Sequence, residues 1–469
     1  MTPARATRPR LLLPAALGAL GVVALGGGAA RAQVPTPTST PPAGIQAPPV
    51  SEPQAATDID ADVSANNDCD GYTPAEGSAA PSPFQVTGYV DLGFAHAQGD
   101  GTSFPANDMR LPADYGVDPF APAVNSRGEA ASTDAGGRFV NGFLPRSAGI
   151  GGRASPLVNT VDFDFRYTAP AAPLMFFSRL QLLPRFTGTG DETRPLLEQA
   201  FGRVVPFDSQ ELALSVGKFD SVVGIEYLDN QANIRTGVTP SLIARYTTGQ
   251  SLGAKLFYRV QLPGIWSAVS LNLAATTSGS FVESLQMPDV SLTGVPVGTG
   301  RLGYELNLPR IQIKAGGSAL YGPRNDQPDR HVLQHIIAAD LRLAFAGLYL
   351  NAEYVRVDED AGHGAKTTSL GVFPLTSEFH ARGFYAQLAY ALAVDAGPLH
   401  KITAYGRYEQ RNAWFEGFTH LLVDRFTAGL RVDLWEALIV KGEILVNRER
   451  QGAPSVPNDV QTLSVVYSF

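Results

Sequence analysis

Apolar and polar residues alternate along most of the chain, in short runs that begin at Phe84 and continue to the last residue, Phe469. In the first run, positions 84, 86, 88, 90, 92 and 94 are apolar or glycine, whereas Gln85, Thr87 and Asp91 lie between them. Successive side chains of a β-strand point to opposite faces, so a period of two predicts strands with one apolar and one polar face. The same pattern recurs at residues 161–167, 302–308, 311–321, 384–390, 402–408 and 426–434.

The connections between these runs alternate between short and long. The short ones fall at 169–173, 206–210, 261–264, 309–310, 344–347, 394–399 and 435–436. The long ones fall at 98–157, 187–196, 220–250, 276–300, 322–333, 358–380, 410–423 and 448–459. Barrels of the bacterial outer membrane have tight periplasmic turns at one rim, longer loops at the other, and strands of about 9–11 residues. We therefore predict an all-β fold, a transmembrane antiparallel up-and-down β-barrel of about 16 strands with both termini on the periplasmic side.

Two parts of this assignment stay open. Helical and strand periodicities compete in residues 174–260, and residues 241–246 fit either an extra strand or part of a loop. Composition supports a barrel, because 44% of the residues are hydrophobic, yet residues 33–469 contain no apolar run of about 20, the length a spanning helix needs. Only helices and closed barrels satisfy every backbone polar group in lipid.

The chain begins with the features of an export signal. Arg5, Arg8 and Arg10 precede an apolar stretch at 11–25, and Ala30-Arg31-Ala32 forms a small-residue cleavage site. We predict a signal peptide at 1–32, a Pro/Thr/Ala-rich disordered periplasmic linker at 33–82, and an outer-membrane β-barrel at 83–469.

Charge and cysteine content exclude some partners. Removal of the predicted signal peptide takes away four arginines and no acidic residue, which changes the formal charge from −8 to −12. Such an acidic chain has no electrostatic reason to bind nucleic acid, so we expect no nucleic-acid partner. The single cysteine, Cys69, excludes an intramolecular disulfide. The acidic stretch at 58–70 has Val63 and Cys69 where a calcium loop needs Gly and Glu, so we expect no metal and no cofactor.

The C-terminal run places Tyr467 and Phe469 on one face and ends on the Phe. It resembles the insertion signal of bacterial outer-membrane proteins, an amphipathic last strand with an aromatic final residue. The resemblance implies that the barrel-assembly machinery binds this strand during insertion into outer-membrane lipid.

Three short motifs resemble a known family. They are Val-Gly-Lys-Phe-Asp at 216–220 followed by Gly-Ile-Glu at 224–226, Gly-Arg-Tyr-Glu at 406–409, and Lys-Gly-Glu at 441–443. With them, the segment from Phe84 to Phe469 resembles Gram-negative outer-membrane porins of the OmpL-like or phosphate-selective (O and P) kind. The resemblance implies a pore in the outer membrane of a Gram-negative bacterium. Phosphate-selective members are expected to line their pore with arginine and lysine. The predicted inward face here mixes both signs of charge, which does not favour phosphate selectivity.

Charged side chains on the predicted polar faces would be costly against lipid, so we expect them to face an aqueous lumen. About 16 strands enclose enough width for a water-filled channel. The predicted pore-lining residues are Arg166, Lys255, Arg259, Glu305, Lys314, Asp340, Arg342, Glu353, Arg407, Glu409, Arg425, Arg431, Asp433, Lys441 and Glu443. The alternative is that these are paired, structural charges in a plugged lumen.

The third long connection, 220–250, is the candidate constriction. Folded inward, it would present Asp220, Glu226, Asp229 and Arg235 to the basic wall, and the narrowest point of a pore sets its selectivity. A plain surface loop is the alternative, and the 98–157 connection is a second candidate for a plug or lid.

These features predict a porin for passive diffusion of small hydrophilic solutes or ions. An outer-membrane enzyme and a structural or adhesive barrel with a plugged lumen are the alternatives. We expect no enzymatic activity: residues 249–253 match a G-x-S-x-G motif, but a strand pattern follows where that motif needs a helix. His331 and His335 have helical ligand spacing but lie where a loop runs into a strand. General porins are usually homotrimers and related families include monomers, so both states stay open.

Overall fold

The computed structural model describes the barrel and most of its turns. The described residues are 82–97, 131–133, 139–143, 155–170, 172–187, 190–207, 211–229, 231–247, 250–263, 266–277, 296–323, 333–360, 365–368, 371–374, 378–415, 421–450 and 459–469. The predicted signal peptide, nearly all of the predicted linker, and Cys69 lie outside them. None of the helices in this described part is long and apolar enough to cross a membrane.

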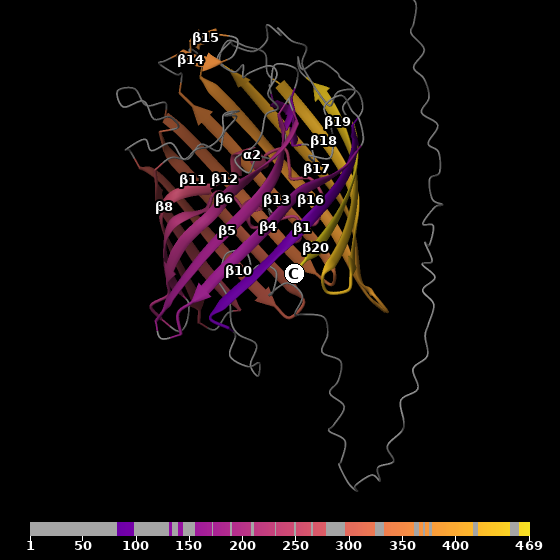
Figure 1. The fold of residues 1–469 in the computed structure, drawn as a ribbon. Helices are drawn as coiled ribbons and strands as arrows, with labels where there is room; N and C mark the ends of the chain where they lie inside the picture. The colour runs from indigo at the N-terminus through magenta and orange to yellow at the C-terminus, as the bar shows by residue number, and fades with distance from the viewer. Residues whose placement is uncertain are drawn as a thin grey trace, which may run out of the picture. The chain divides into compact units, whose positions relative to one another are not determined.

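Sixteen antiparallel strands form one closed barrel, as Figure 1 shows, which confirms the predicted fold class. Each strand pairs with its neighbours in the order of the chain, and β1 closes the ring by pairing with both β4 and β20. The strands are β1 (Phe84–Ala97), β4 (Ser155–Thr168), β5 (Leu174–Thr187), β6 (Gly190–Val204), β7 (Leu212–Asp220), β8 (Gln250–Leu262), β9 (Ser267–Thr276), β10 (Val297–Leu308), β11 (Ile311–Pro323), β12 (Leu333–Phe345), β13 (Leu348–Glu359), β16 (Phe379–Ala396), β17 (Leu399–Phe415), β18 (Leu421–Leu434), β19 (Leu438–Arg450) and β20 (Val460–Ser468).

Two small hairpins lie outside the ring in the strand order. One consists of β2 (Ala131–Thr133) and β3 (Phe139–Phe143), within the first long connection. The other consists of β14 (Ala365–Thr368) and β15 (Gly371–Pro374), between β13 and β16. Both belong to the rim with long connections. The first residue of β1 and the last residue of β20 lie at the opposite rim.

The turns at the other rim are short. β10 and β11 are joined by residues 309–310 and β12 and β13 by residues 346–347. Ala346 and Gly347 both have positive φ, 49° and 83°, as a two-residue hairpin turn of the I′ type requires. Two predicted long connections, 187–196 and 410–423, are wrong, because both consist mostly of strand residues. Residues 187–196 belong mostly to β5 and β6, which pair as far as Thr187 with Gly190. A hairpin can continue through a polar stretch of sequence, so polarity alone did not mark a loop here.

The last residue closes the seam of the barrel. Phe469 and Gly88 exchange two backbone hydrogen bonds, of 2.9 and 3.0 Å. The ring of Phe469 packs against that of Phe163, with the ring centres 5.8 Å apart. β20 therefore continues its pairing with β1 to the very end of the chain.

The outer face of the barrel is apolar and carries aromatic residues near both rims. Near the short turns, Trp266 and Trp435 are 66% and 60% exposed. Near the long connections, the rings of Phe384, Tyr408 and Phe426 follow one another across three strands, at 5.7 and 4.7 Å. Leucines and isoleucines between these two levels are exposed as well, including Leu302, Leu388, Leu430 and Ile444. An apolar band between two aromatic girdles is the surface that a lipid bilayer requires.

Candidate functional site

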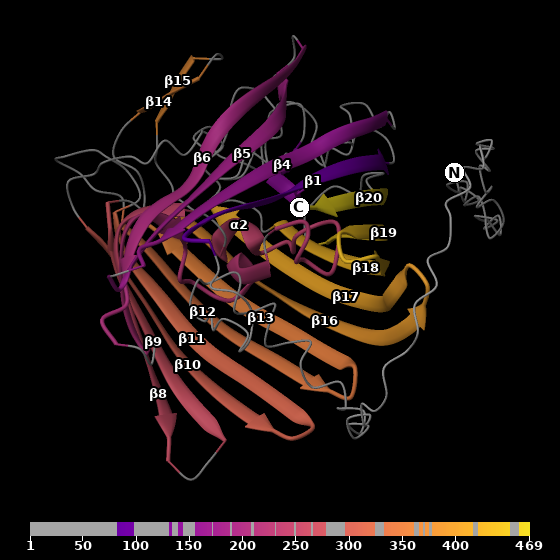
Figure 2. The ribbon, with the colours of Figure 1, turned by 60° about the horizontal axis from the view of Figure 1, so that its bottom comes forward.

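A segment between β7 and β8 lies inside the barrel. Residues 221–247, here called the inserted segment, include a single 3-10 turn, η2 (Glu226–Asp229), and one helical turn, α2 (Ala244–Thr247). Figure 2 shows α2 within the ring of strands. Residues 241–246 therefore form no extra strand. Of the four residues predicted for a constriction, Glu226, Asp229 and Arg235 lie in the inserted segment, and Asp220 ends β7.

The inserted segment is held first by apolar packing. Its residues Val223, Leu242, Ile243 and Tyr246 belong to one buried cluster with side chains of the inward wall. The wall residues of this cluster are Val297, Leu320, Ile336, Ala338, Val355, Val357, Ala381, Tyr385, Ala413 and Val423. One sector of the lumen is therefore dry, which the alternation pattern did not indicate.

Carboxylates of the wall accept hydrogen bonds from the backbone of the inserted segment. Oε2 of Glu353 accepts from the amides of Ile225 and Glu226, at 3.3 and 3.1 Å. Oε2 of Glu409 accepts from the amide of Leu242 at 2.6 Å. The same role falls to Glu443, whose Oε2 accepts from the amide and the hydroxyl of Thr239 at 2.9 and 2.8 Å. These bonds satisfy donors that the segment, having no sheet partner, would otherwise leave buried and unpaired.

Cations of the wall donate to carbonyl oxygens of the same segment. Arg407 donates to the carbonyls of residues 239 and 240 at 3.0 and 3.2 Å, and Arg425 donates to residue 240 at 2.6 Å. Arg431 donates to residues 234 and 235 at 2.9 and 3.2 Å. Lys441 donates to three carbonyls, those of residues 232, 235 and 237. These four cations thus bind peptide carbonyls of the inserted segment, in addition to the contacts that its side chains make with the wall.

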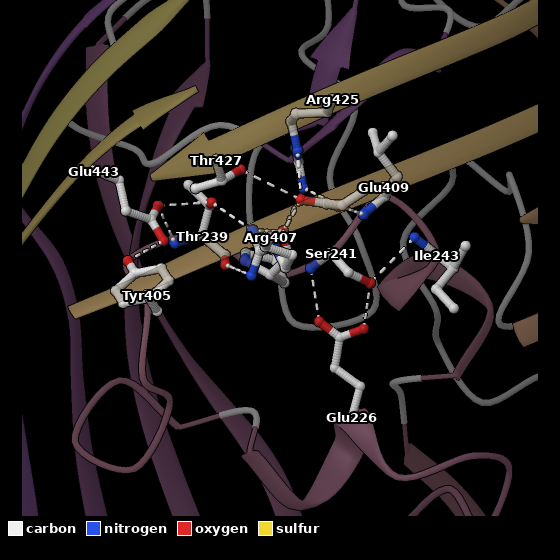
Figure 3. Close-up of polar contacts among 12 residues, drawn as sticks. Glu226, Thr239, Ser241, Ile243, Tyr405, Arg407, Glu409, Arg425, Thr427 and Glu443 are labelled. Carbon is white, nitrogen blue, oxygen red and sulfur yellow. Dashed lines mark hydrogen bonds and ion pairs between the residues drawn. The ribbon is translucent and has the colours of Figure 1, made fainter. Parts of the chain in front are cut away.

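The wall charges also pair with one another, as Figure 3 shows. Glu409 lies between two arginines, with Arg407 at 2.6 Å and Arg425 at 2.7 Å. Tyr405 donates to the other oxygen of Glu443 at 2.7 Å. All five side chains are buried, so these charges are neutralised inside the lumen and leave no net charge exposed to a solute.

A carboxylate of the inserted segment fixes the segment's own conformation. Oε1 of Glu226 accepts from the amide of Ser241 at 2.6 Å, and its Oε2 accepts from the Ser241 hydroxyl. Burial raises the pKa of Glu226 above its ordinary value of 4.5, although the bonds from Ser241 act in the opposite direction. A raised folded-state pKa means that the folded protein gives up this proton less readily than the unfolded chain.

A pH dependence follows for Glu226. Its contribution to the free energy of unfolding should be full below the unfolded pKa and decline as pH rises through the folded pKa. Glu226→Gln should therefore lose less stability than the wild type when the pH rises from about 4 to about 8. Urea unfolding at several pH values measures this, with Glu436→Gln, at an exposed turn, as the control. Parallel pH profiles for E226Q and the wild type would contradict it.

Two ion pairs lie where the inserted segment meets the rest of the wall. Arg342 binds Asp229 at 2.7 Å and donates to the carbonyl of Ile225 at 3.2 Å. Arg179 binds Asp164 through two hydrogen bonds, of 2.6 and 2.8 Å. Arg179 was absent from the predicted lining because its strand, β5, lies in the part of the chain where two periodicities compete.

A cavity of about 700 Å³, lined by charged and neutral polar side chains and by apolar ones, lies between the inserted segment and the walls of β1, β4, β5, β11 to β13, and β16 to β18. Its basic lining residues are Arg166, Arg179, Lys314, Arg342, Lys401 and Arg431. Its acidic ones are Asp164, Asp229 and Glu436. Asn233, Gln312, Asn351 and Gln387 are among its neutral polar residues. Unlike the dry sector, this side of the lumen presents charges to open space.

All the predicted lining residues point inward, but their surroundings differ. Glu353, Arg407, Glu409, Arg425, Lys441 and Glu443 are buried under the inserted segment, and Asp340 is buried in a pair with Arg301 at 2.6 Å. Arg166, Lys314, Arg342 and Arg431 line the cavity. Glu305 lies between Arg259 and Lys314, at 3.1 and 3.6 Å. Lys255 packs over the ring of Phe219 at 5.6 Å, and Asp433 pairs with Arg431 at 2.8 Å.

Lining residues missed from the sequence include Arg301 and Arg411 in addition to Arg179. Arg301 precedes the run used to define its strand, and Arg411 lies in a stretch assigned to a loop, 410–423, that the structure gives mostly to β17 and β18. Arg411 donates to the hydroxyl of Tyr246 at 2.9 Å. Extension of the run at 302–308 by one residue and of the run at 402–408 by three would have found both.

The described residues offer little to an enzyme. Ser251 of the G-x-S-x-G motif lies in β8, paired with Phe219 of β7, and the strand continues after it. His335 lies in β12 and its ring packs against Tyr321 at 4.7 Å, while His331 lies outside the described residues. Within the described part of the chain, no group of three or more His, Cys, Asp or Glu side chains is arranged to hold a metal ion.

No protein-family model and no curated protein matches the chain. Solved structures with a similar fold include the outer-membrane channel DcaP of Acinetobacter baumannii, with a TM-score of 0.47 and 10% identity over 82% of this chain and 97% of that one. An anion-selective porin from Comamonas acidovorans has a TM-score of 0.45 and 7% identity, over 82% and 99%. A trimer form of OmpT, an outer-membrane protein of Vibrio cholerae, has 0.42 and 9%, over 82% and 99%.

The structure itself decides the architecture. Sixteen strands close into one ring, the outer face is apolar between two aromatic girdles, and the inner face carries the charges. Short turns alternate with long connections around this ring, as in barrels of the Gram-negative outer membrane. The chain is therefore an outer-membrane β-barrel with the fold of the porins.

Proposed function

We propose that the chain forms a water-filled channel for passive diffusion of small hydrophilic solutes or ions. The observation that carries the proposal is the cavity of about 700 Å³ beside the inserted segment, whose lining includes nine charged side chains. A charged, open space inside a membrane-spanning barrel binds water rather than lipid, and no covalent step or cofactor is needed for solutes to move through it. The proposal assigns the chain no enzymatic activity.

The inserted segment would set the width of this channel. Hydrogen bonds to its backbone fasten it to β1, β13, β17, β18 and β19, including one from the amide of Ala232 to Tyr89 at 3.3 Å. A segment held on several sides keeps a fixed position, which a size-selective constriction needs. At its edge, Asp229 faces Arg342, and these two side chains would meet a passing solute.

Planar-bilayer recording of the full-length chain, purified from outer membranes in detergent, tests the proposal. We expect discrete conductance steps that vary linearly with voltage. The cavity lining has six basic and three acidic side chains, and Glu305 and Asp433 pair with two of the basic ones, so under a salt gradient we expect a reversal potential that indicates a weak preference for anions. Arg166→Gln combined with Lys314→Gln should shift that potential toward cations, and Arg310→Gln, at a turn on the rim, should not.

A folded barrel that gives no steps would overturn the channel and favour a plugged barrel with a structural or adhesive role. The apolar cluster between the inserted segment and the wall is the feature that favours this second reading. A vesicle-swelling measurement distinguishes the open channel from the plugged barrel. A plugged barrel would exclude both ions and small neutral sugars.

The remaining partners are also proposals. The last strand, with Tyr467 and Phe469, would bind the barrel-assembly machinery, and the outer face would contact membrane lipid. A homotrimer is proposed by analogy with general porins, and the mass of the detergent-solubilised particle distinguishes it from a monomer. The signal peptide at 1–32 predicts Gln33 as the first residue of the mature chain, which mass spectrometry of the purified protein can establish.

A further inference from the structure

Outward-facing basic residues gather at one part of the rim with long connections. Arg356 of β13 and Arg382 of β16 are directly opposite each other in the strand register, and both are exposed. Arg448 and Arg450 of β19 are exposed on the same outer face. These arginines are here called the rim arginines. They are absent from the lumen and from the proposed function, which leaves their position to be explained.

The rim arginines lie just above the aromatic girdle. Arg356 follows Tyr354 by two residues on the same face, and Arg382 precedes Phe384 by two, on the side of the long connections. Arg448 packs over the ring of Phe426 at 5.6 Å. Since aromatic girdles mark the boundary between hydrocarbon and headgroups, the rim arginines are at the level of the lipid headgroups.

Like charges directly opposite in an antiparallel pair are unfavourable, and Arg356 and Arg382 form such a pair. Arg356 donates two hydrogen bonds to Asp358, of 2.7 and 3.3 Å, and its side chain is 56% exposed, so the outer side of its guanidinium group stays open to an anion. The guanidinium of Arg382 packs over Trp414 at 5.7 Å. This packing fixes the direction of Arg382 without neutralising it. An anion bound between the two guanidinium groups would remove the repulsion.

Side chains on the neighbouring strands surround Arg356 and Arg382 and fix the positions of the groups around them. His380 stacks on Trp414, with ring centres 5.2 Å apart, and its Nδ1 lies 2.8 Å from Asp358. Nearby, Arg450 binds the buried carboxylate of Asp424 at 2.6 Å. The acidic side chains are thus already engaged, and the aromatic ring of Trp414 stands beside the arginine pair as a second contact for a headgroup.

We propose that Arg356 and Arg382 bind the phosphate of a lipid headgroup in the outer leaflet. Guanidinium groups bind phosphate oxygens in a bidentate manner, which suits an exposed pair better than a point charge would. The long-connection rim faces this leaflet, and the girdle beneath holds the acyl chains next to Tyr354 and Phe384. The site is independent of solute passage through the lumen.

Native mass spectrometry of the detergent-solubilised full chain tests this inference, with diphosphorylated lipid A as the probe. Arg356→Gln combined with Arg382→Gln should weaken binding about tenfold or more, since two charge-assisted contacts are lost. Arg310→Gln, with the same change of charge type at the opposite rim, should bind as the wild type does. R356K with R382K should lie between, because lysine keeps the charge and loses the bidentate geometry.

Lipid A from which both phosphates have been removed is the decisive comparison. The wild type should bind it as weakly as the double glutamine variant binds the phosphorylated form. Equal binding of both lipids by the wild type, or full binding by the double variant, would overturn the inference. Circular dichroism and single-channel conductance of the variant should match the wild type, which separates this result from any failure of the channel proposal.

Discussion

Replacement of most of the inserted segment by a short Gly-Ser turn should raise single-channel conductance several-fold. Asp220 and Gln250, which flank the segment, are direct partners in the register of β7 and β8, so a tight hairpin can join the two strands without altering the ring. Removal of residues 223–246 would clear the centre of the lumen and leave the wall charges to water. Conductance in a planar bilayer at high salt gives the measurement.

The matched control shortens a connection elsewhere. β11 and β12 pair as far as Pro323 with Leu333, so the residues between them can be replaced by the same Gly-Ser turn. This variant removes only the residues between two paired strand ends and leaves the inserted segment intact, so its conductance should equal that of the wild type. If both deletions change conductance alike, or neither does, the inserted segment is not the narrowest part of the path.

Glu409→Ala should destabilise the barrel by about 3–5 kcal/mol, because it leaves two buried arginines without their shared counter-charge. The side chain of Glu409 is fully buried, and those of Arg407 and Arg425 are 4% and 1% exposed. The change also removes the acceptor for the amide of Leu242. Urea unfolding in phosphatidylcholine vesicles, followed by tryptophan fluorescence, measures the difference.

Glu305→Ala is the control, because it removes the same kind of side chain from a similar ion-pair cluster. Glu305 also lies between two cations, Arg259 and Lys314, but its side chain is 24% exposed and theirs are 37% and 28%. Water screens such a group, so the loss should be about 1 kcal/mol or less. Replacement of Arg407, Glu409 and Arg425 together by Met, Met and Leu should recover much of the stability, as for other buried ion clusters. Equal losses for the two glutamates would show that the lumen is wet throughout.

Alternation along the chain was sufficient to predict the barrel, its strand number and the inward direction of its charges. The alternation within a single strand shows which residues lie on its polar face, so Glu305 and Lys314 could be assigned to the lumen without knowledge of their neighbours. The alternation of short and long connections distinguished the two rims of the ring. These are local properties, and a sequence contains them directly.

The dry sector could not be predicted in the same way. Ile336 and Ile337 are consecutive in β12, one buried inside the barrel and the other exposed outside, and a strand with two apolar faces gives no signal as to which face meets lipid. Val355 and Val357 of β13 point inward because Leu242 and Ile243, more than a hundred residues earlier, cover them. Such packing depends on contacts between distant parts of the chain.

The way the inserted segment is fastened has a consequence for assembly. Its polar partners belong mainly to β17, β18 and β19, and the bonds from Lys441 and Glu443 reach back more than 200 residues. An incomplete ring that lacks these last strands keeps apolar packing and the bonds from Arg342 and Glu353, but it lacks most of the polar contacts that fix residues 232–242. The barrel must be nearly complete before its own channel acquires a fixed width. Selectivity is then a late product of folding, and chains truncated near the C-terminus should lose it before they lose their early strands.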